Sequence, residues 1–241
     1  MPNPVKAILF DSGRVLNGPA TGHWFIPPHF FEWVDRSAFA AIPHQQRREA
    51  FARAARSIGE PNLIPTVTEE YQHFLGYYRI LFQHLPQLKM TDDRIAAVAN
   101  DLVYNNQKYR FYDDVFQTIP TLNRQYKLAV VSDAWPSLED VFRAAGLRDY
   151  FSAFVISSAL GVTKPDPRMY TAALRQLQIA PEAAVFVDDN PQNCHGAKAL
   201  GIRSILLCRE PKLFWYRKLC DREFPVVRDL HGLLKSPTLL R

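Results

Sequence analysis

Residues that could do chemistry follow four short apolar segments of this 241-residue chain. They are Asp11, Ser132-Asp133, Lys164 and Asp188-Asp189. A carboxylate can act as a nucleophile, a base or a metal ligand, and crowded carboxylates repel one another unless a cation neutralises them. Oxygen ligands favour Mg²⁺, while a lysine ammonium or a serine hydroxyl can hold a phosphate oxygen. These residue types indicate metal-assisted chemistry on an anionic group.

The apolar segments before these residues have the length and composition of buried strands. Residues 7–10 are all apolar and end at Asp11, which is typical of a central strand in a parallel sheet. From residue 112 onward such segments alternate with helical patterns, which implies right-handed βαβ units. The predicted strands are 7–10, 127–131, 153–156, 184–187, 202–207 and 224–227, and the predicted helices are 113–126, 137–145, 168–177, 191–200 and 229–234. We therefore expect a Rossmann-like parallel sheet core flanked by helices, of the α/β class.

Asp11 alone allows a second interpretation. Asp, Ser and Gly all favour turns, so residues 11–13 could be no more than the turn that ends a strand. In an open α/β sheet, however, the carboxyl ends of the strands lie along one edge, where ligands bind. The other polar residues at predicted strand ends can converge on Asp11 there, which favours a role in chemistry.

Residues 17–108 differ in character from the rest of the chain. Residues 17–19, Asn-Gly-Pro, predict a turn, and residues 29–107 show helical patterns with no convincing strand. The predicted helices are 45–58, 69–85 and 91–104. We expect an α/β core formed by 1–16 and 109–241, and an inserted α-helical cap domain formed by 17–108. Residues 209–222 look like a smaller insertion before the last strand.

Composition narrows the class of protein. Hydrophobic residues make up 47% of the chain, which is enough for a sizeable core, and the formal net charge is only +5 without a long basic run. The three cysteines form no CxxC pair, which argues against a disulfide framework or a zinc site. We see neither a secretory signal nor an apolar segment long enough for a membrane span. We expect a cytoplasmic monomer or homodimer with no nucleic-acid or membrane partner.

Four motifs together resemble the haloacid dehalogenase-like hydrolase superfamily, in its branch with a helical cap inserted after the first core strand. The matching segments are FDSGRVL (10–16), VVSDA (130–134), KPDPRMY (164–170) and VFVDDNPQN (185–193). Each is weak alone, but their order and positions at strand ends span the whole core. The resemblance implies a modified Rossmann fold whose cap closes over the substrate and excludes water.

The resemblance also implies a role for each matching residue. Asp11 would be the nucleophile that attacks phosphorus and forms an aspartyl-phosphate. Ser132 would bind the transferring phosphoryl group, with Asp133 beside it, and Lys164 would neutralise charge on that group and on Asp11. Arg14 could contact an anionic substrate. This division of labour suits phosphoryl transfer, in which catalysis is mostly positioning and charge stabilisation.

The implied metal site uses the same strand ends. Asp189 would be a direct Mg²⁺ ligand beside the Asp11 carboxylate and the Gly13 carbonyl, with Asp188 nearby or bridging through water. Gly13 is also a departure from the family, whose phosphatases usually carry an aspartate there as general acid and base. Such help is typically worth about 10²- to 10⁴-fold in rate.

The sequence favours a Mg²⁺-dependent phosphatase that acts on a small phosphorylated metabolite. One alternative is a 2-haloacid dehalogenase with the same Asp11 nucleophile. That branch, however, has Asn at the position of Asp133 and Asp at the position of Asn193, and a paired Asp188-Asp189 suits a metal site. The other alternative is a catalytically idle binding protein, suggested by Gly13 and by aromatic stretches.

Overall fold

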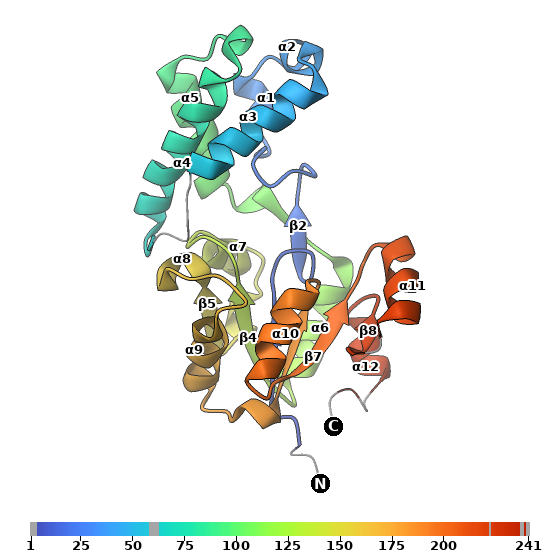
Figure 1. Ribbon diagram of the computed structural model, residues 1–241. Coiled ribbons are helices and arrows are strands. Elements are labelled where there is room, and N and C mark those ends of the chain that lie inside the picture. The colour runs from blue at the N-terminus through green and yellow to red at the C-terminus, as the bar shows by residue number, and fades with distance from the viewer. Residues whose placement is uncertain (1–3, 58–62, 222, 237–238, 240–241) are drawn as a thin grey trace.

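The computed structural model describes residues 4–57, 63–221, 223–236 and 239. Figure 1 shows two bodies: a sheet with helices on both faces, and a group of helices above the carboxyl edge of that sheet. A narrow two-stranded connection joins them. None of the helices in the described residues is long and apolar enough to cross a membrane.

The sheet of the lower body has the order β5-β4-β1-β6-β7-β8, and all its pairings are parallel. Its strands are β1 (Ala7–Phe10), β4 (Lys127–Ser132), β5 (Ala153–Ile156), β6 (Ala184–Asp188), β7 (Arg203–Leu207) and β8 (Val226–Val227). The chain enters at the centre of the sheet in β1 and later builds outward on either side. The prediction of a Rossmann-like α/β fold is confirmed.

Helices cover both faces of this sheet because its strands are apolar on both faces. Side chains of Ile8 and Phe10 in β1 join one core cluster, whereas those of Ala7 and Leu9 join another. The first cluster includes residues of α6 (Asp113–Asn123), α7 (Leu138–Ala144) and α12 (His231–Lys235), and the second includes residues of α9 (Pro167–Leu177) and α10 (Pro191–Ala199). The uninterrupted apolar run 7–10 is therefore explained by burial on two sides.

Most predicted elements of this body differ from the structure only at their ends. The helix expected at 113–126 stops at Asn123, and the strand expected at 224–227 keeps only Val226–Val227. Short elements complete the body: α8 (Ser157–Leu160), the 3-10 turns η3 (Arg148–Tyr150) and η4 (Pro181–Ala183), and α11 (Pro211–Cys220). The segment 209–222, expected as an insertion, thus holds α11 in its described part.

The upper body is helical and has its own core. It contains α1 (Phe30–Trp33), α2 (Arg36–Ala41), α3 (His44–Ser57), α4 (Val67–Gln83), η1 (Pro86–Leu88), α5 (Asp92–Tyr104) and η2 (Asn106–Lys108). Phe30, Phe74 and Tyr78 are among its buried residues, in a cluster separate from those of the sheet. The described part of 29–107 contains no strand, as predicted; Ile58, the expected end of a helix, lies outside the described residues. The division at 17–108 stays a prediction.

The connection between the bodies corrects one expectation. Residues 17–19 form a strand, β2 (Asn17–Pro19), which pairs antiparallel with β3 (Tyr109–Phe111). The turn prediction was wrong because local preferences of Asn, Gly and Pro are outweighed here by the returning chain, which lies beside the departing chain. The two links to the helical body therefore form one ribbon, visible below the helices in Figure 1.

Candidate active site

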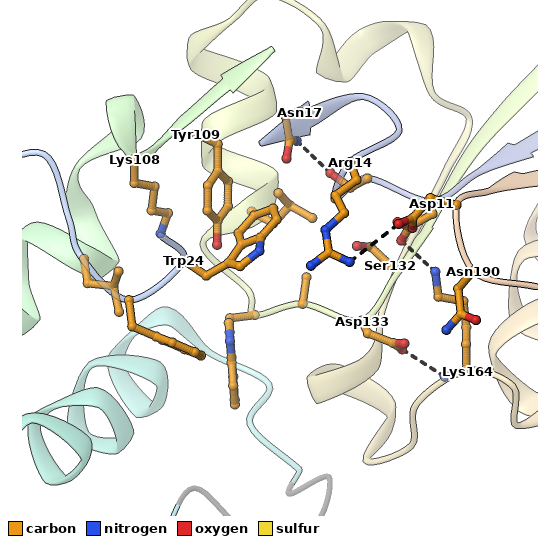
Figure 2. A pocket seen from close by; sticks show the side chains of 18 of the residues that line it. Asp11, Arg14, Asn17, Trp24, Lys108, Tyr109, Ser132, Asp133, Lys164 and Asn190 are labelled. Carbon is orange, nitrogen blue, oxygen red and sulfur yellow. Dashed lines mark hydrogen bonds and ion pairs between the residues drawn. The ribbon is translucent and has the colours of Figure 1, made fainter. Parts of the chain in front are cut away.

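The predicted site residues meet where three neighbouring strands end. β1 lies between β4 and β6, with Phe10 paired to both Val130 and Val187, so Asp11 emerges between the ends of those two strands. A cavity of about 340 Å³ opens there and reaches the helical body. Its lining includes Asp11, Gly13, Arg14, Ser132, Asp133, Lys164 and Asp189. Figure 2 shows Asp11, Ser132, Asp133 and Lys164 grouped on one side of this cavity.

Lys164 connects two of the carboxylates. Its Nζ donates to Asp11 Oδ1 at 2.6 Å and to Asp188 Oδ2 at 2.8 Å, and its side chain is only 1% exposed. Burial opposes the charged lysine, but the carboxylates of Asp11 and Asp188 outweigh it and raise the pKa of Lys164 above its ordinary value. The lysine is therefore a permanently charged partner of Asp11.

Backbone packing fixes the loop that carries Lys164. The backbone N–H of Lys164 donates to Asp133 Oδ1 at 2.9 Å. On the other side, a Cβ added at Gly196 in α10 would lie 2.6 Å from Pro165 Cβ, closer than two carbons can approach. Only glycine at position 196 lets α10 pack directly against this loop. Asp133 therefore helps to hold the loop that carries Lys164 in place, and it also lines the cavity.

Three carboxylates share this one lysine. Oxygens of Asp11, Asp188 and Asp189 all lie within 4.8 Å of one another. Burial raises the pKa of Asp11 to about 7; Lys164 opposes the shift, while Asp188 and Asp189 add to it. The cluster carries more negative charge than Lys164 neutralises, and it offers only oxygen ligands. Such a donor set fits a hard divalent cation such as Mg²⁺.

The two adjacent aspartates differ in how many partners they have. Asp188 is fully buried, and its oxygens accept from Lys164, from the Asn190 backbone N–H at 2.7 Å and from Asn193 Nδ2 at 3.0 Å. Asp189 keeps 26% of its side chain exposed and has Arg14 at 3.6 Å. Burial and the neighbouring Asp188 raise the pKa of Asp189. Asp189 is thus the more available of the two for a cation.

The loop after Asp11 is tightly bonded. The Ser12 carbonyl accepts from the backbone N–H groups of Leu16 and Asn17 at 2.8 and 3.0 Å, and Asn17 Nδ2 donates to Ser12 Oγ at 2.7 Å. Arg14 adopts a left-handed conformation with φ of 60°, which is uncommon for a residue with a side chain. This backbone directs Arg14 over the cavity toward Asp189.

Asn17 is a site residue that the sequence did not reveal. It is fully buried, lines the cavity, and its Oδ1 has no hydrogen-bond partner among the described residues. A buried acceptor of this kind is costly unless something donates to it. Its sequence context, Asn-Gly-Pro, reads only as a turn, so no local signal would have identified it.

The helical body contributes a second buried polar cluster that sequence reasoning also missed. Glu70 Oε2 accepts from the Ser137 backbone N–H at 2.7 Å, and Glu70 Oε1 accepts from the Ser137 hydroxyl. Lys108 Nζ donates to the same hydroxyl and to the Val103 carbonyl at 2.9 Å, with Glu70 3.9 Å away. Burial lowers the pKa of Lys108 to about 8, against the pull of Glu70. Burial likewise raises the pKa of Glu70.

Aromatic rings form the rest of the cavity on the helical side. Trp24 packs edge-on against Tyr109, with ring centroids 5.3 Å apart, and Phe74 packs edge-on against Trp135 at 5.1 Å. Phe25 lines the cavity as well. Trp24 comes from the outgoing link and Tyr109 from the returning one, so the ribbon itself brings these two together.

A parallel sheet with clustered carboxylates and a lysine at its strand ends, below an inserted helical body, defines an α/β protein of the capped-hydrolase type. Comparison with known families agrees: residues 34–207 match the haloacid dehalogenase-like hydrolases. The chain belongs to this family. The prediction of the superfamily from the four motifs is thereby confirmed.

The proteins that are similar to this chain are named for different activities. A phosphoserine phosphatase of Thermus thermophilus is 30% identical over 134 residues, which are 54% of this chain and 54% of that protein. The chain thus spans about half the length of this curated relative. A glyceraldehyde 3-phosphate phosphatase of Methanopyrus kandleri is 31% identical over 213 residues, covering 85% and 84%. In structure, a 2-haloacid dehalogenase of Pseudomonas syringae superposes with a TM-score of 0.63 at 20% identity over 98% of both chains, a likeness of fold.

Proposed function

We propose that this protein is a Mg²⁺-dependent phosphomonoester hydrolase that acts through an aspartyl-phosphate on a small phosphorylated metabolite. The observation that carries the proposal is the placement of Lys164 Nζ between Asp11 Oδ1 and Asp188 Oδ2, with the third carboxylate, Asp189, facing the same cavity. The phosphatase relatives support the same activity.

In this proposal each residue of the site has a defined role. Asp11 attacks phosphorus with Oδ2, the carboxylate oxygen that Lys164 leaves free. The bond from phosphorus to the ester oxygen breaks, and the leaving group departs with the electron pair and takes a proton from water. Lys164 offsets charge on Asp11 and on the phosphoryl oxygens, and Ser132, at the end of β4, donates its hydroxyl to one of them. Water then attacks phosphorus of the aspartyl-phosphate, which restores the Asp11 carboxylate. Arg14 lies over the cavity and adds positive charge for an anionic substrate.

The donor set also supports a metal. Mg²⁺ would be held directly by the carboxylates of Asp11 and Asp189 and by the Gly13 carbonyl. Asp188 would lie next to these ligands, with its own oxygens bonded to Lys164, Asn190 and Asn193. When bound, the ion would neutralise phosphoryl oxygens and orient them toward Asp11. Without such an ion, burial is the main cause that raises the pKa of Asp11 above its ordinary value, and the carboxylates of Asp188 and Asp189 add to this shift.

The local contacts favour a phosphatase over a 2-haloacid dehalogenase. Asn193 donates to Asp188 and thereby supports a carboxylate pair that a metal-free site would not need. Asp133 is bonded to the Lys164 backbone, so the residue that departs from the dehalogenase pattern has a structural partner here. Both contacts fit a site built around excess negative charge.

Replacement of the nucleophile tests the proposal. Asp11→Asn should reduce hydrolysis of para-nitrophenyl phosphate by about 10⁴-fold or more, since an amide cannot form the acyl phosphate. The exposed Asp93→Asn serves as the control and should keep full turnover. Chelation with EDTA should stop the reaction and added Mg²⁺ should restore it.

Two outcomes would contradict the phosphatase proposal. Undiminished turnover by Asp11→Asn would remove the aspartyl-phosphate mechanism. Halide release from a 2-haloacid without metal, in the absence of phosphate release, would identify the protein as a dehalogenase instead. Activity on neither substrate class, over a broad panel of phosphorylated metabolites, would favour the idle binding protein.

A further inference from the structure

Trp24 crowds the place where a side chain at position 13 would lie. A Cβ built on Gly13 would meet Trp24 Cη2 at 3.3 Å and Cζ2 at 3.5 Å, while Asp11 Oδ2 lies 4.0 Å from it. The indole ring therefore reaches the immediate neighbourhood of the nucleophile. The indole would have to shift by a few tenths of an ångström to admit a side chain at position 13, so this side of the Gly13 loop is bordered by an aromatic ring.

The other proton donors on the helical side do not replace a carboxylate at position 13, because of their position or their chemistry. Lys108 lies at the opposite end of the cavity from Asp11, with Trp24 and Tyr109 between them in the view of Figure 2. Both oxygens of Glu70 accept from Ser137. The Tyr109 hydroxyl holds its proton tightly, since burial raises its pKa above the ordinary value.

The cavity wall between the two ends is aromatic. Trp24, Tyr109, Phe74 and Trp135 line it, and their pairwise edge-on packing holds the rings at fixed angles. Such a wall matches a flat, apolar group, which gains from burial and from ring contacts. A small polyhydroxylated group would lose its hydrogen bonds with water there and would recover few of them.

We infer that the substrate is an aryl phosphate, whose leaving group is flat and departs as a stabilised anion without being protonated by the enzyme. This inference rests on the proposed phosphatase function and names the substrate class of that site. Trp24 is its specificity-determining residue, because it crowds the space beside Gly13, where a proton-donating side chain would lie, and supplies part of the aromatic wall.

The reaction balances without a protein proton donor at position 13. As the bond from Asp11 Oδ2 to phosphorus forms, the bond from phosphorus to the aryl oxygen breaks, and the aryloxide leaves with the electron pair. It takes a proton from water afterwards. A water molecule then adds to phosphorus, the bond to Asp11 breaks, and the proton of that water passes to the solvent with release of phosphate.

The substrate series tests the inference on the wild-type protein. With Mg²⁺ present, kcat/KM should fall in the order para-nitrophenyl phosphate, phenyl phosphate, glycerol phosphate, and the first should exceed the last by about 10²-fold or more. Acetyl phosphate, with a good leaving group but no ring, should fall below para-nitrophenyl phosphate in kcat/KM through a higher KM. Equal kcat/KM for glycerol phosphate and para-nitrophenyl phosphate would overturn the inference and leave the phosphatase intact. Absence of Asp11-dependent hydrolysis of any of these would remove the phosphatase itself.

Paired variants at positions 13 and 24 test the role of Trp24. In Gly13→Asp alone the new carboxylate meets the indole, so glycerol phosphate hydrolysis should not improve. In Gly13→Asp combined with Trp24→Ala the carboxylate has room, and kcat/KM for glycerol phosphate should rise about 10²-fold over Trp24→Ala. Trp24→Phe, which keeps an aromatic ring, should retain the aryl preference. The same aryl-to-alkyl ratio in Trp24→Ala as in the wild type would show that Trp24 does not determine specificity.

Discussion

Two buried clusters, each with one lysine, face each other across the cavity and differ in their charge balance. The sheet-edge cluster consists of Asp11, Lys164, Asp188 and Asp189, and the cap-side cluster consists of Glu70, Lys108 and Ser137. At the sheet edge three carboxylates share one ammonium group. On the cap side one carboxylate faces one ammonium group, and a serine links them.

The comparison indicates that the charge balance of a buried cluster, more than the residue types in it, distinguishes a reactive site from a structural contact. The cap-side cluster is neutral, and both Glu70 oxygens have donors, so it has no need of a further ion. It joins Glu70 of α4 and Lys108 of η2 to Ser137, which precedes α7, and thereby fastens the helical body to the sheet body. The sheet-edge cluster retains negative charge that a cation would have to balance.

Removal of the lysine should have the largest effect at the sheet edge. Lys164→Met removes the ammonium group that contacts Asp11 and Asp188, and we expect kcat/KM for para-nitrophenyl phosphate to fall by about 10³-fold. Lys198→Met, which changes an exposed lysine paired with Glu223, is the matched control and should lose little. Comparable activity in the two variants would make the lysine of the sheet-edge cluster structural.

The corresponding change in the cap-side cluster should act on stability. Glu70→Gln keeps the shape of the side chain but leaves buried Lys108 without its carboxylate, which should cost about 3 kcal/mol in the free energy of unfolding. Urea denaturation of this variant and of the exposed Glu49→Gln measures the difference. A cost below about 0.5 kcal/mol for Glu70→Gln would mean that the cluster does not fasten the two bodies.

The affinity for Mg²⁺ should depend on Asp189, the sheet-edge aspartate that faces the cavity, and should not depend on an exposed surface aspartate. Asp189→Asn should weaken Mg²⁺ binding by at least about 10-fold in calorimetric titration, whereas Asp93→Asn should leave it unchanged. The comparison needs no substrate. Unaltered Mg²⁺ affinity in Asp189→Asn would refute the direct role of this carboxylate.

The smallest expected effect concerns the pH dependence of the cap-side lysine. Burial lowers the pKa of Lys108 in the folded protein to about 8, below its ordinary value of 10.5. Between these two values the unfolded chain binds more protons than the folded one, so stability rises with pH. Relative to Lys108→Arg, which stays charged, the wild type should gain about 1 kcal/mol from about pH 8 to about pH 9. Parallel stability curves for the two proteins would contradict the lowered pKa.

Much of the sheet-edge cluster could be predicted because each of its residues follows a run of apolar residues. The strands at 7–10, 153–156 and 184–187 were placed to within one residue, since burial on both faces leaves an uninterrupted apolar signal. Parallel strands then bring Asp11 and Asp188 together without any further information. The exact contacts of Lys164 needed the structure, because its loop lies between elements.

The cap-side cluster could not be predicted for the converse reason. Glu70 and Lys108 lie in polar stretches that read as exposed helix and connection, and Ser137 reads as a helix start. Their burial depends on how the helical body docks on the sheet body, which no local pattern encodes. Asn17 was misjudged in the same way, since the pairing of β2 with β3 places it.

The register of the β2–β3 pair determines which side chains line the cavity. β2 and β3 are three residues each, joined as Asn17 to Phe111, Gly18 to Arg110 and Pro19 to Tyr109. A slip by one residue would turn Tyr109 to the opposite side of the ribbon. Natural variants should therefore tolerate added or lost residues in the turns between cap helices much better than in these six positions, where a single insertion would change which side chains the substrate meets.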